Sequence, residues 1–206
     1  MVKAIINEFA ENTYILSENK QAYIIDPGSN YQAMHDYIEE HNLEVLGVLL
    51  THGHYDHICG LNDLLEAFDA PIYIHELERD FLFDPSLNLS NFMASRFKIK
   101  DKHRVQAIDD THSFNLGDDV ITVIVTPGHT RGGLSFYYKA MLFTGDALFK
   151  ENIGRTDLPT GDQTVLEASI KKIYATFPDN TVVYPGHGPF TTLAHEKNFN
   201  PFIRAT

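Results

Sequence analysis

Histidine and aspartate side chains cluster in one short segment, THGHYDH at residues 51–57. His52 and His54 are two positions apart around a glycine, so both imidazoles can point to one side of the chain. Asp56 and His57 follow at once and can face a neighbouring point. Imidazole and carboxylate groups are typical ligands of transition-metal ions. The segment therefore predicts a metal site, provided that the surrounding structure agrees.

Three further candidate ligands each follow a stretch of β-branched or aromatic residues and a turn that contains glycine. Glycine permits a sharp turn, and sites in open α/β sheets lie beyond the carboxyl ends of the strands. We therefore expect these three side chains to join the first four. They are His129, Asp146 and His187.

The seven side chains are too many for one catalytic ion, which takes about three protein ligands and keeps one position open. Two ions ~3.5–4 Å apart that share a carboxylate would use all seven. The nitrogen and oxygen donors, with no sulfur, suit zinc, iron or manganese, and we expect two divalent ions, with zinc as the preferred metal. The assignment is His52, His54 and His129 to the first ion, Asp56, His57 and His187 to the second, and Asp146 as the bridge.

Short apolar runs alternate with stretches of helical period along the whole chain, which is typical of a layered α/β fold. Residues 84–104 show no period and predict a long surface excursion, whose part around residues 88–97 could cover the substrate. No linker divides the chain, so we expect one domain over residues 1–206. Strands are expected over 2–6, 13–16, 22–25, 45–50, 72–74, 120–125, 134–138, 141–143 and 181–184, and helices over 31–40, 57–68, 163–176 and 189–198.

Composition restricts the partners of the 206-residue chain. Its formal net charge of -12 repels phosphate backbones and anionic lipids, which argues against nucleic acid and membranes as partners. The single cysteine excludes an internal disulfide and suits a reducing compartment. With neither a signal-peptide pattern nor an apolar run near ~20 residues, we expect a cytoplasmic protein with a small-molecule substrate. The oligomeric state stays open.

The ligand pattern resembles the metallo-β-lactamase superfamily, whose mark is His-x-His-x-Asp-His followed by separate His, Asp and His ligands. The resemblance covers nearly the whole chain and implies an αβ/βα four-layer sandwich with the metals at one edge. The sequence IIDPG at residues 24–28 is similar to an early turn of that family. By this resemblance, Asp26 supports the metal ligands from behind.

Within the superfamily, the stretches TPGHTRGGLSFYY and LFTGDALFKENIGRTDLPTGD resemble short bacterial members of the glyoxalase II-like group. The resemblance implies hydrolysis of acyl thioesters such as S-lactoylglutathione. Two features depart from long glyoxalase II enzymes: only 19 residues follow His187, and GRTD at 154–157 replaces a lysine and a tyrosine that bind the thiol moiety. Arg155 could bind a substrate carboxylate through its forked donors.

The expected mechanism is attack on the thioester carbonyl by hydroxide held between the two ions, with Asp56 as the catalytic group that ligates the second ion and orients the hydroxide. A rival is a mononuclear iron persulfide dioxygenase that uses His52, His129 and Asp146. Other hydrolases of the same fold, an esterase or a nuclease, are further alternatives, and a lactamase is less expected from the segment after Asp146.

Overall fold

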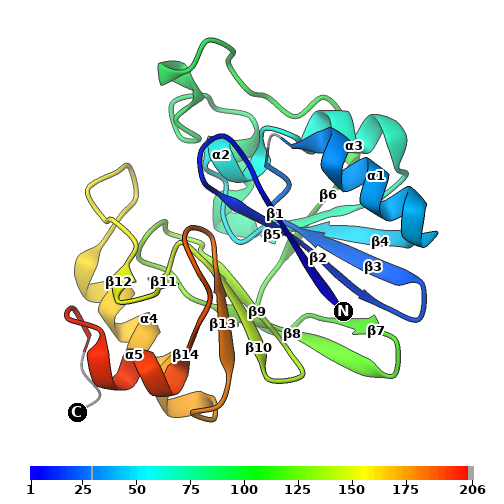
Figure 1. The fold of residues 1–206 in the computed structure, drawn as a ribbon. Helices are drawn as coiled ribbons and strands as arrows, with labels where there is room; N and C mark the ends of the chain where they lie inside the picture. Colours follow the sequence, from blue (N-terminus) through cyan, green and yellow to red (C-terminus); the bar gives the residue numbers. More distant parts are fainter. Residues whose placement is uncertain (29, 204–206) are drawn as a thin grey trace.

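Two β-sheets lie face to face in the computed structural model, which describes residues 1–28 and 30–203. Helices α1 (Tyr31–His41) and α3 (Leu61–Ala67) lie on the outer side of the first sheet, and α4 (Gln163–Thr176) and α5 (Leu193–Phe199) on the outer side of the second (Figure 1). This arrangement is the αβ/βα sandwich that the sequence predicts.

The first sheet follows the chain order from β1 to β6. Strands β1 to β3 form an antiparallel meander, whereas β3, β4, β5 and β6 are parallel to one another. The carboxyl end of β4 leads into the histidine-rich segment and then into α2 (Tyr55–Ile58). The strands are β1 (Val2–Ile6), β2 (Asn12–Glu18), β3 (Gln21–Ile25), β4 (Glu44–Leu49), β5 (Ile72–His75) and β6 (Val105–Ile108).

The second sheet has the order β14-β13-β10-β9-β8-β7. Strand β9 is antiparallel to both β8 and β10, and β13 is parallel to β10. Strands β8, β10 and β13 therefore run in the same direction, and their carboxyl ends lie at one edge of the sheet. A small hairpin of β11 (Leu148–Phe149) and β12 (Asn152–Ile153) lies next to that edge (Figure 1). The strands are β7 (Ser113–Leu116), β8 (Asp119–Val125), β9 (Leu134–Tyr138), β10 (Met141–Gly145), β13 (Val182–Pro185) and β14 (Thr191–Thr192).

Alternating side chains distribute the apolar residues over three layers, because successive residues of a strand face opposite sides. In β3, Ile24 packs under α1 and α3, whereas Ile25 faces the second sheet. In β8, Val123 faces the first sheet and Ile124 packs against Leu166 of α4. Both sheets are thus buried on two faces, which holds their strand ends in fixed positions.

The helix expected over residues 57–68 is wrong in extent, because the chain breaks it into α2 and α3. The backbone N–H of Gly60 donates to the carbonyl of Pro27 at 3.1 Å. A Cβ atom at Gly60 would lie 1.8 Å from the carbonyl oxygen of Gly28. Tight docking on this early turn therefore interrupts the helix.

The helix expected over 189–198 begins later, at Leu193. Thr192 caps it by accepting a hydrogen bond from the N–H of His195 at 3.2 Å, and residues 191–192 pair with β13. The short strands β6, β7, β11, β12 and β14 were not expected; β11, β12 and β14 have two residues each, which is too few to show a period.

The excursion over residues 84–104 is anchored to the body of the protein. The amide of Asn88 is buried and donates to the carbonyls of Phe81 (2.7 Å) and Phe97 (3.3 Å). The excursion includes η2 (Ser90–Phe92) and η3 (Lys102–Arg104), and Phe92 near its tip is largely exposed. Within the described residues, no helix is long and apolar enough to cross a membrane.

Candidate metal centre

Four strand ends deliver the side chains that the sequence singles out. Residues 51–57 follow β4 of the first sheet, and the other three side chains follow β8, β10 and β13 of the second. The N–H of Leu134 donates to the carbonyl of Thr51 at 2.8 Å, and the N–H of Gly186 donates to that of Gly145 at 2.8 Å. Backbone hydrogen bonds therefore join the loops at the edge of the sandwich.

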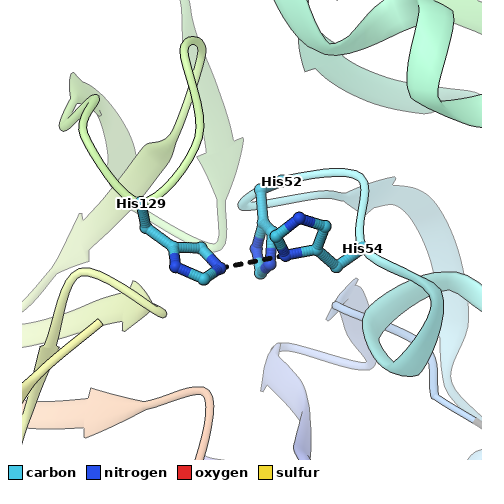
Figure 2. Close-up of side chains that lie close together, drawn as sticks. All are labelled: His52, His54 and His129. Atoms are coloured by element: carbon cyan, nitrogen blue, oxygen red, sulfur yellow. Dashed lines mark hydrogen bonds between the residues drawn. The ribbon is translucent and has the colours of Figure 1, made fainter. Parts of the chain in front are cut away.

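The first ligand group consists of His52, His54 and His129, all buried, with ring nitrogens within 4.8 Å of one another. Nδ1 of His54 lies 2.9 Å from Nε2 of His129. The ring of His52 is edge-on to the other two, at centroid distances of 4.7 and 4.9 Å. Figure 2 shows the three rings converging from two loops.

The second ligand group consists of Asp56, His57 and His187, whose ligand atoms also lie within 4.8 Å of one another. Oδ2 of Asp56 lies 3.1 Å from Nε2 of His187 and 3.8 Å from Nε2 of His57. His57 is completely buried, while Asp56 and His187 are partly exposed. The second group is therefore more accessible to solvent than the first.

Asp146 lies between the two groups. Its Oδ1 is 3.3 Å from Nε2 of His57, and its Oδ2 is 3.6 Å from Nε2 of His129 and 3.7 Å from Nε2 of His187. One carboxylate thus contacts members of both groups. This is the position that the sequence interpretation gives to a bridging ligand.

Most of the histidines are held by an acceptor on the side of the ring away from the centre. A carbonyl or carboxylate can only accept, so Nδ1 carries a proton, and in the neutral ring Nε2 is left with a free lone pair. Contacts of this kind orient imidazoles for metal binding. Nδ1 of His52 donates to Thr51 Oγ1 (3.1 Å), that of His57 to Asp26 Oδ2 (3.0 Å), that of His129 to the carbonyl of Arg155 (2.7 Å) and that of His187 to the carbonyl of Ala10 (3.0 Å).

Asp26, expected to support the ligands, holds two of these histidines. It accepts hydrogen bonds from the N–H of Thr51 (2.7 Å) and the hydroxyl of Thr51 (2.5 Å), in addition to the one from His57. Because the Thr51 hydroxyl donates to Asp26, it accepts from His52. One buried carboxylate therefore orients a member of each ligand group.

Several buried atoms of the candidate ligands have no hydrogen-bond partner in the described part of the chain. A buried polar atom without a partner costs about 1–3 kcal/mol, so a protein retains such a group where something else satisfies it. A cation is the complement of free imidazole and carboxylate lone pairs. The donor set therefore fits divalent metal ions. The unpaired atoms are Nε2 of His52, His54 and His57, and Oδ1 of Asp146.

The electrostatics favour metal-binding protonation states in the first group and in the carboxylates. Burial, and then the neighbouring His129, lower the pKa of His54 to about 3, and burial lowers the pKa of His52 well below its usual range. Burial opposes the ionisation of Asp146, but His57 and His129 outweigh it and hold its pKa below the ordinary value. Burial likewise opposes the ionisation of Asp56, but His57 and His187 outweigh it and hold the pKa of Asp56 below the ordinary value.

Arg155 contributes its backbone to the centre, whereas its side chain is engaged elsewhere. The guanidinium binds Asp157 through two hydrogen bonds of 2.7 Å and is exposed, while the carbonyl of Arg155 accepts from His129. A substrate carboxylate would therefore compete with Asp157 for Arg155.

The excursion over residues 84–104 lies next to the centre, because Tyr55 donates its N–H to the carbonyl of Asn88 at 2.9 Å.

Glu78 of η1 (Glu76–Leu82) is a residue that sequence reasoning missed. It is completely buried and accepts hydrogen bonds from the N–H groups of Gly53 and Gly132. In the sequence it is one of several acidic residues in a polar stretch, so neither its type nor its spacing distinguishes it. Only the tertiary structure identifies it as a neighbour of the ligand loops.

We expect the metal-free protein to lose stability, relative to a Glu78→Gln variant, as the pH rises from 4.5 to 7. Burial raises the pKa of Glu78 from 4.5 to about 7. In that range the native state binds a proton that the unfolded chain releases, so the free energy of unfolding falls with pH by about 3 kcal/mol in total. Urea denaturation of both proteins at several pH values measures this difference, and a difference that stays constant with pH would contradict the prediction.

The comparisons with known proteins agree with this geometry. The sequence model of the metallo-beta-lactamase superfamily matches residues 6–187. A probable metallo-hydrolase of Streptococcus pyogenes is 41% identical, over 96% of this chain and 88% of its own. The hydroxyacylglutathione hydrolase GloC of Haemophilus influenzae is 33% identical, over 97% of this chain and 96% of its own.

Solved structures show the same fold over nearly the full chain. The crystal structure of the B3 metallo-beta-lactamase BLEG-1 has a TM-score of 0.91 and 38% identity, covering 98% of this chain and 99% of that one. The di-iron-bound form of TTHA1623 has a TM-score of 0.86 and 32% identity, covering 98% and 100%.

Proposed function

The chain belongs to the metallo-beta-lactamase superfamily, and from this premise we propose that it hydrolyses acyl thioesters such as S-lactoylglutathione with two divalent metal ions. The observation that carries the proposal is the convergence of seven nitrogen and oxygen ligands with unpaired buried atoms at their centre. Catalytic sites with one ion use about three protein ligands, so seven favour two ions.

In this proposal each ligand group would hold one ion, and Asp146 lies between the two groups. The first ion would be bound by His52, His54 and His129. The donors suit zinc, and the di-iron form of a relative that is 32% identical supports iron as an alternative. When bound, the two ions would supply a water of lowered pKa and a Lewis acid for the carbonyl oxygen of the substrate.

The residues of the chain would bind and orient the reactants. Oδ2 of Asp56 lies 3.1 Å from His187, which leaves Oδ1 to accept a hydrogen bond from the attacking water. A thiol has a pKa near 8.5, so a thiolate leaves without a general acid. Because the guanidinium of Arg155 is bound to Asp157, we propose that the acyl thioester, and not the peptide part of glutathione, is the main determinant of binding.

The names of two relatives indicate hydrolysis of different bonds. The identity of the substrate is therefore what an experiment has to decide. The relative from Haemophilus influenzae is named a hydroxyacylglutathione hydrolase, and a relative of known structure is named a B3 metallo-beta-lactamase. Hydrolysis of β-lactams is therefore the second candidate. Both reactions need attack on a carbonyl, but only the thioester releases a thiol.

The deciding experiment compares substrates on protein whose metal content has been measured. Thiol release from S-lactoylglutathione and from an acyl thioester of N-acetylcysteamine is set against opening of a chromogenic β-lactam. We expect kcat/KM for the thioesters to exceed that for the β-lactam by at least about 100-fold. The reverse order would support a lactamase, and oxygen uptake with glutathione persulfide would support the dioxygenase alternative.

A further inference from the structure

A buried carboxylate connects the two loops that carry the first ligand group. Oε2 of Glu78 accepts from the N–H of Gly53 at 3.1 Å, and its Oε1 accepts from the N–H of Gly132 at 2.9 Å. Gly53 lies between His52 and His54, while Gly132 follows His129 by three residues. The side chain of Glu78 therefore connects the ligand loop that follows β4 in the first sheet with the ligand loop that follows β8 in the second sheet.

The η1 helix also packs tightly against the histidine-rich segment. A Cβ atom at Gly53 would lie 2.3 Å from Cβ of Phe81, so only glycine allows this approach. The loop between His52 and His54 thus has η1 directly behind it. Its position is set by the packing of Phe81 and by the carboxylate of Glu78 together.

We propose that Glu78 is a positioning residue for the first metal ion, and that its carboxylate sets the distance between the His52–His54 loop and His129. This inference rests on the two-metal function proposed above. Glu78 lies behind the backbone and not among the ligands, so its effect passes through Gly53 and Gly132. Loss of the carboxylate should weaken the binding of the first ion and leave the binding of the second ion unchanged.

Independent contacts hold the second ligand group, which is why the effect should be selective. His57 is held by Asp26 at 3.0 Å, and His187 by the carbonyl of Ala10 at 3.0 Å. The carbonyl of Asp56 accepts from the side-chain amide of Asn7 at 3.1 Å. These three supports come from the residue that follows β3 and from the β1–β2 turn, and not from η1.

Stabilisation of the fold alone does not account for a carboxylate at this position. Burial raises the pKa of Glu78 to about 7, so an ionised carboxylate at this position costs stability at neutral pH. An ionised carboxylate is nevertheless the group that can accept from two N–H groups at once. Glutamine would turn an N–H₂ donor toward one of them, and alanine would leave both without an acceptor.

The experiment measures metal content and metal affinity in three variants. Glu78→Ala and Glu78→Gln are compared with Glu76→Gln, an exposed glutamate on the same short helix that serves as the matched control. Each protein is loaded with Co²⁺, desalted and analysed for ions per chain and for its visible absorption spectrum. His54→Ala and His187→Ala give the reference spectra for loss of the first and second ion. Urea unfolding of each metal-free protein reports the stability of the fold.

We expect wild type and Glu76→Gln to hold two ions. Glu78→Ala should hold one ion and give the spectrum of His54→Ala, and Glu78→Gln should bind the first ion about 10–100-fold more weakly. If the alanine variant fails to fold, the glutamine variant decides by the same readings.

Two results would overturn the inference: Glu78 variants that keep both ions at wild-type affinity, and variants that lose the second ion or lose both together. A wild-type protein with only one ion would instead contradict the proposed two-metal function. In that case the inference stands if Glu78→Ala and His54→Ala both lose that ion, and it fails if Glu78→Ala keeps it.

Discussion

Replacement of Asp146 by alanine is expected to lower kcat for thioester hydrolysis by at least about 10³-fold. The carboxylate lies within 3.3–3.7 Å of His57, His129 and His187, so it contacts members of both ligand groups. Its loss removes the negative charge that would hold two cations close together. Asp146→Asn keeps the shape but not the charge, and we expect nearly the same loss.

Steady-state thiol release, metal content and circular dichroism measure this effect together. The metal content should fall while the secondary structure stays close to that of wild type, since Asp146 follows β10 and is not part of the apolar core. Asp118→Asn, in the exposed β7–β8 turn, is the matched control and should keep full activity. Wild-type turnover in either Asp146 variant would show that the bridging assignment is wrong.

Removal of the metal ions is expected to abolish hydrolysis and to lower the melting temperature by about 10 °C. Ligand present at 1,000 times its dissociation constant stabilises a native protein by about 4 kcal/mol. In a domain of this size, 1 kcal/mol corresponds to about 2–4 °C. The loss of a partner for the unpaired nitrogens of the buried histidines is part of this binding free energy.

The measurement is a chelator titration followed by metal analysis, differential scanning calorimetry and thiol release. Addition of Zn²⁺, Fe²⁺ or Mn²⁺ to separate samples should restore activity and melting temperature together, and the most effective ion indicates the metal that the site prefers. Full activity in protein with less than about 0.1 ion per chain would exclude a metal-dependent reaction. Protein treated with metal-saturated chelator controls for damage by the reagent.

Strands of five or more residues were predictable from the sequence because they carry a clear pattern of apolar residues. Residues 2–6 and 134–138 form strands with the predicted bounds, and α4 begins and ends where its apolar spacing indicates. The helix after the histidine-rich segment was predicted as one piece, because its apolar period continues through Gly60. Its interruption depends on contact with the turn at Pro27, which lies 33 residues earlier and leaves no local signal.

The candidate ligands could be found because few residue types bind metals and because glycine turns place them at strand ends. What holds them could be predicted only in part. Asp26 was expected from a family resemblance, but Ala10 and Arg155 act through backbone carbonyls, which every residue possesses. Glu78 shows the same limit, since an acidic side chain becomes informative only when its burial is known.

The hydrogen bond between the carbonyl of Ala10 and His187 joins residues 177 positions apart in the chain. During synthesis, the first ligand group has all its members once residue 129 has left the ribosome. The second group has to wait for residue 187, although the acceptor for that histidine is among the first residues made. The second group can therefore be assembled only after the last strand-end loop has been made and has packed against the turn formed by the first residues of the chain.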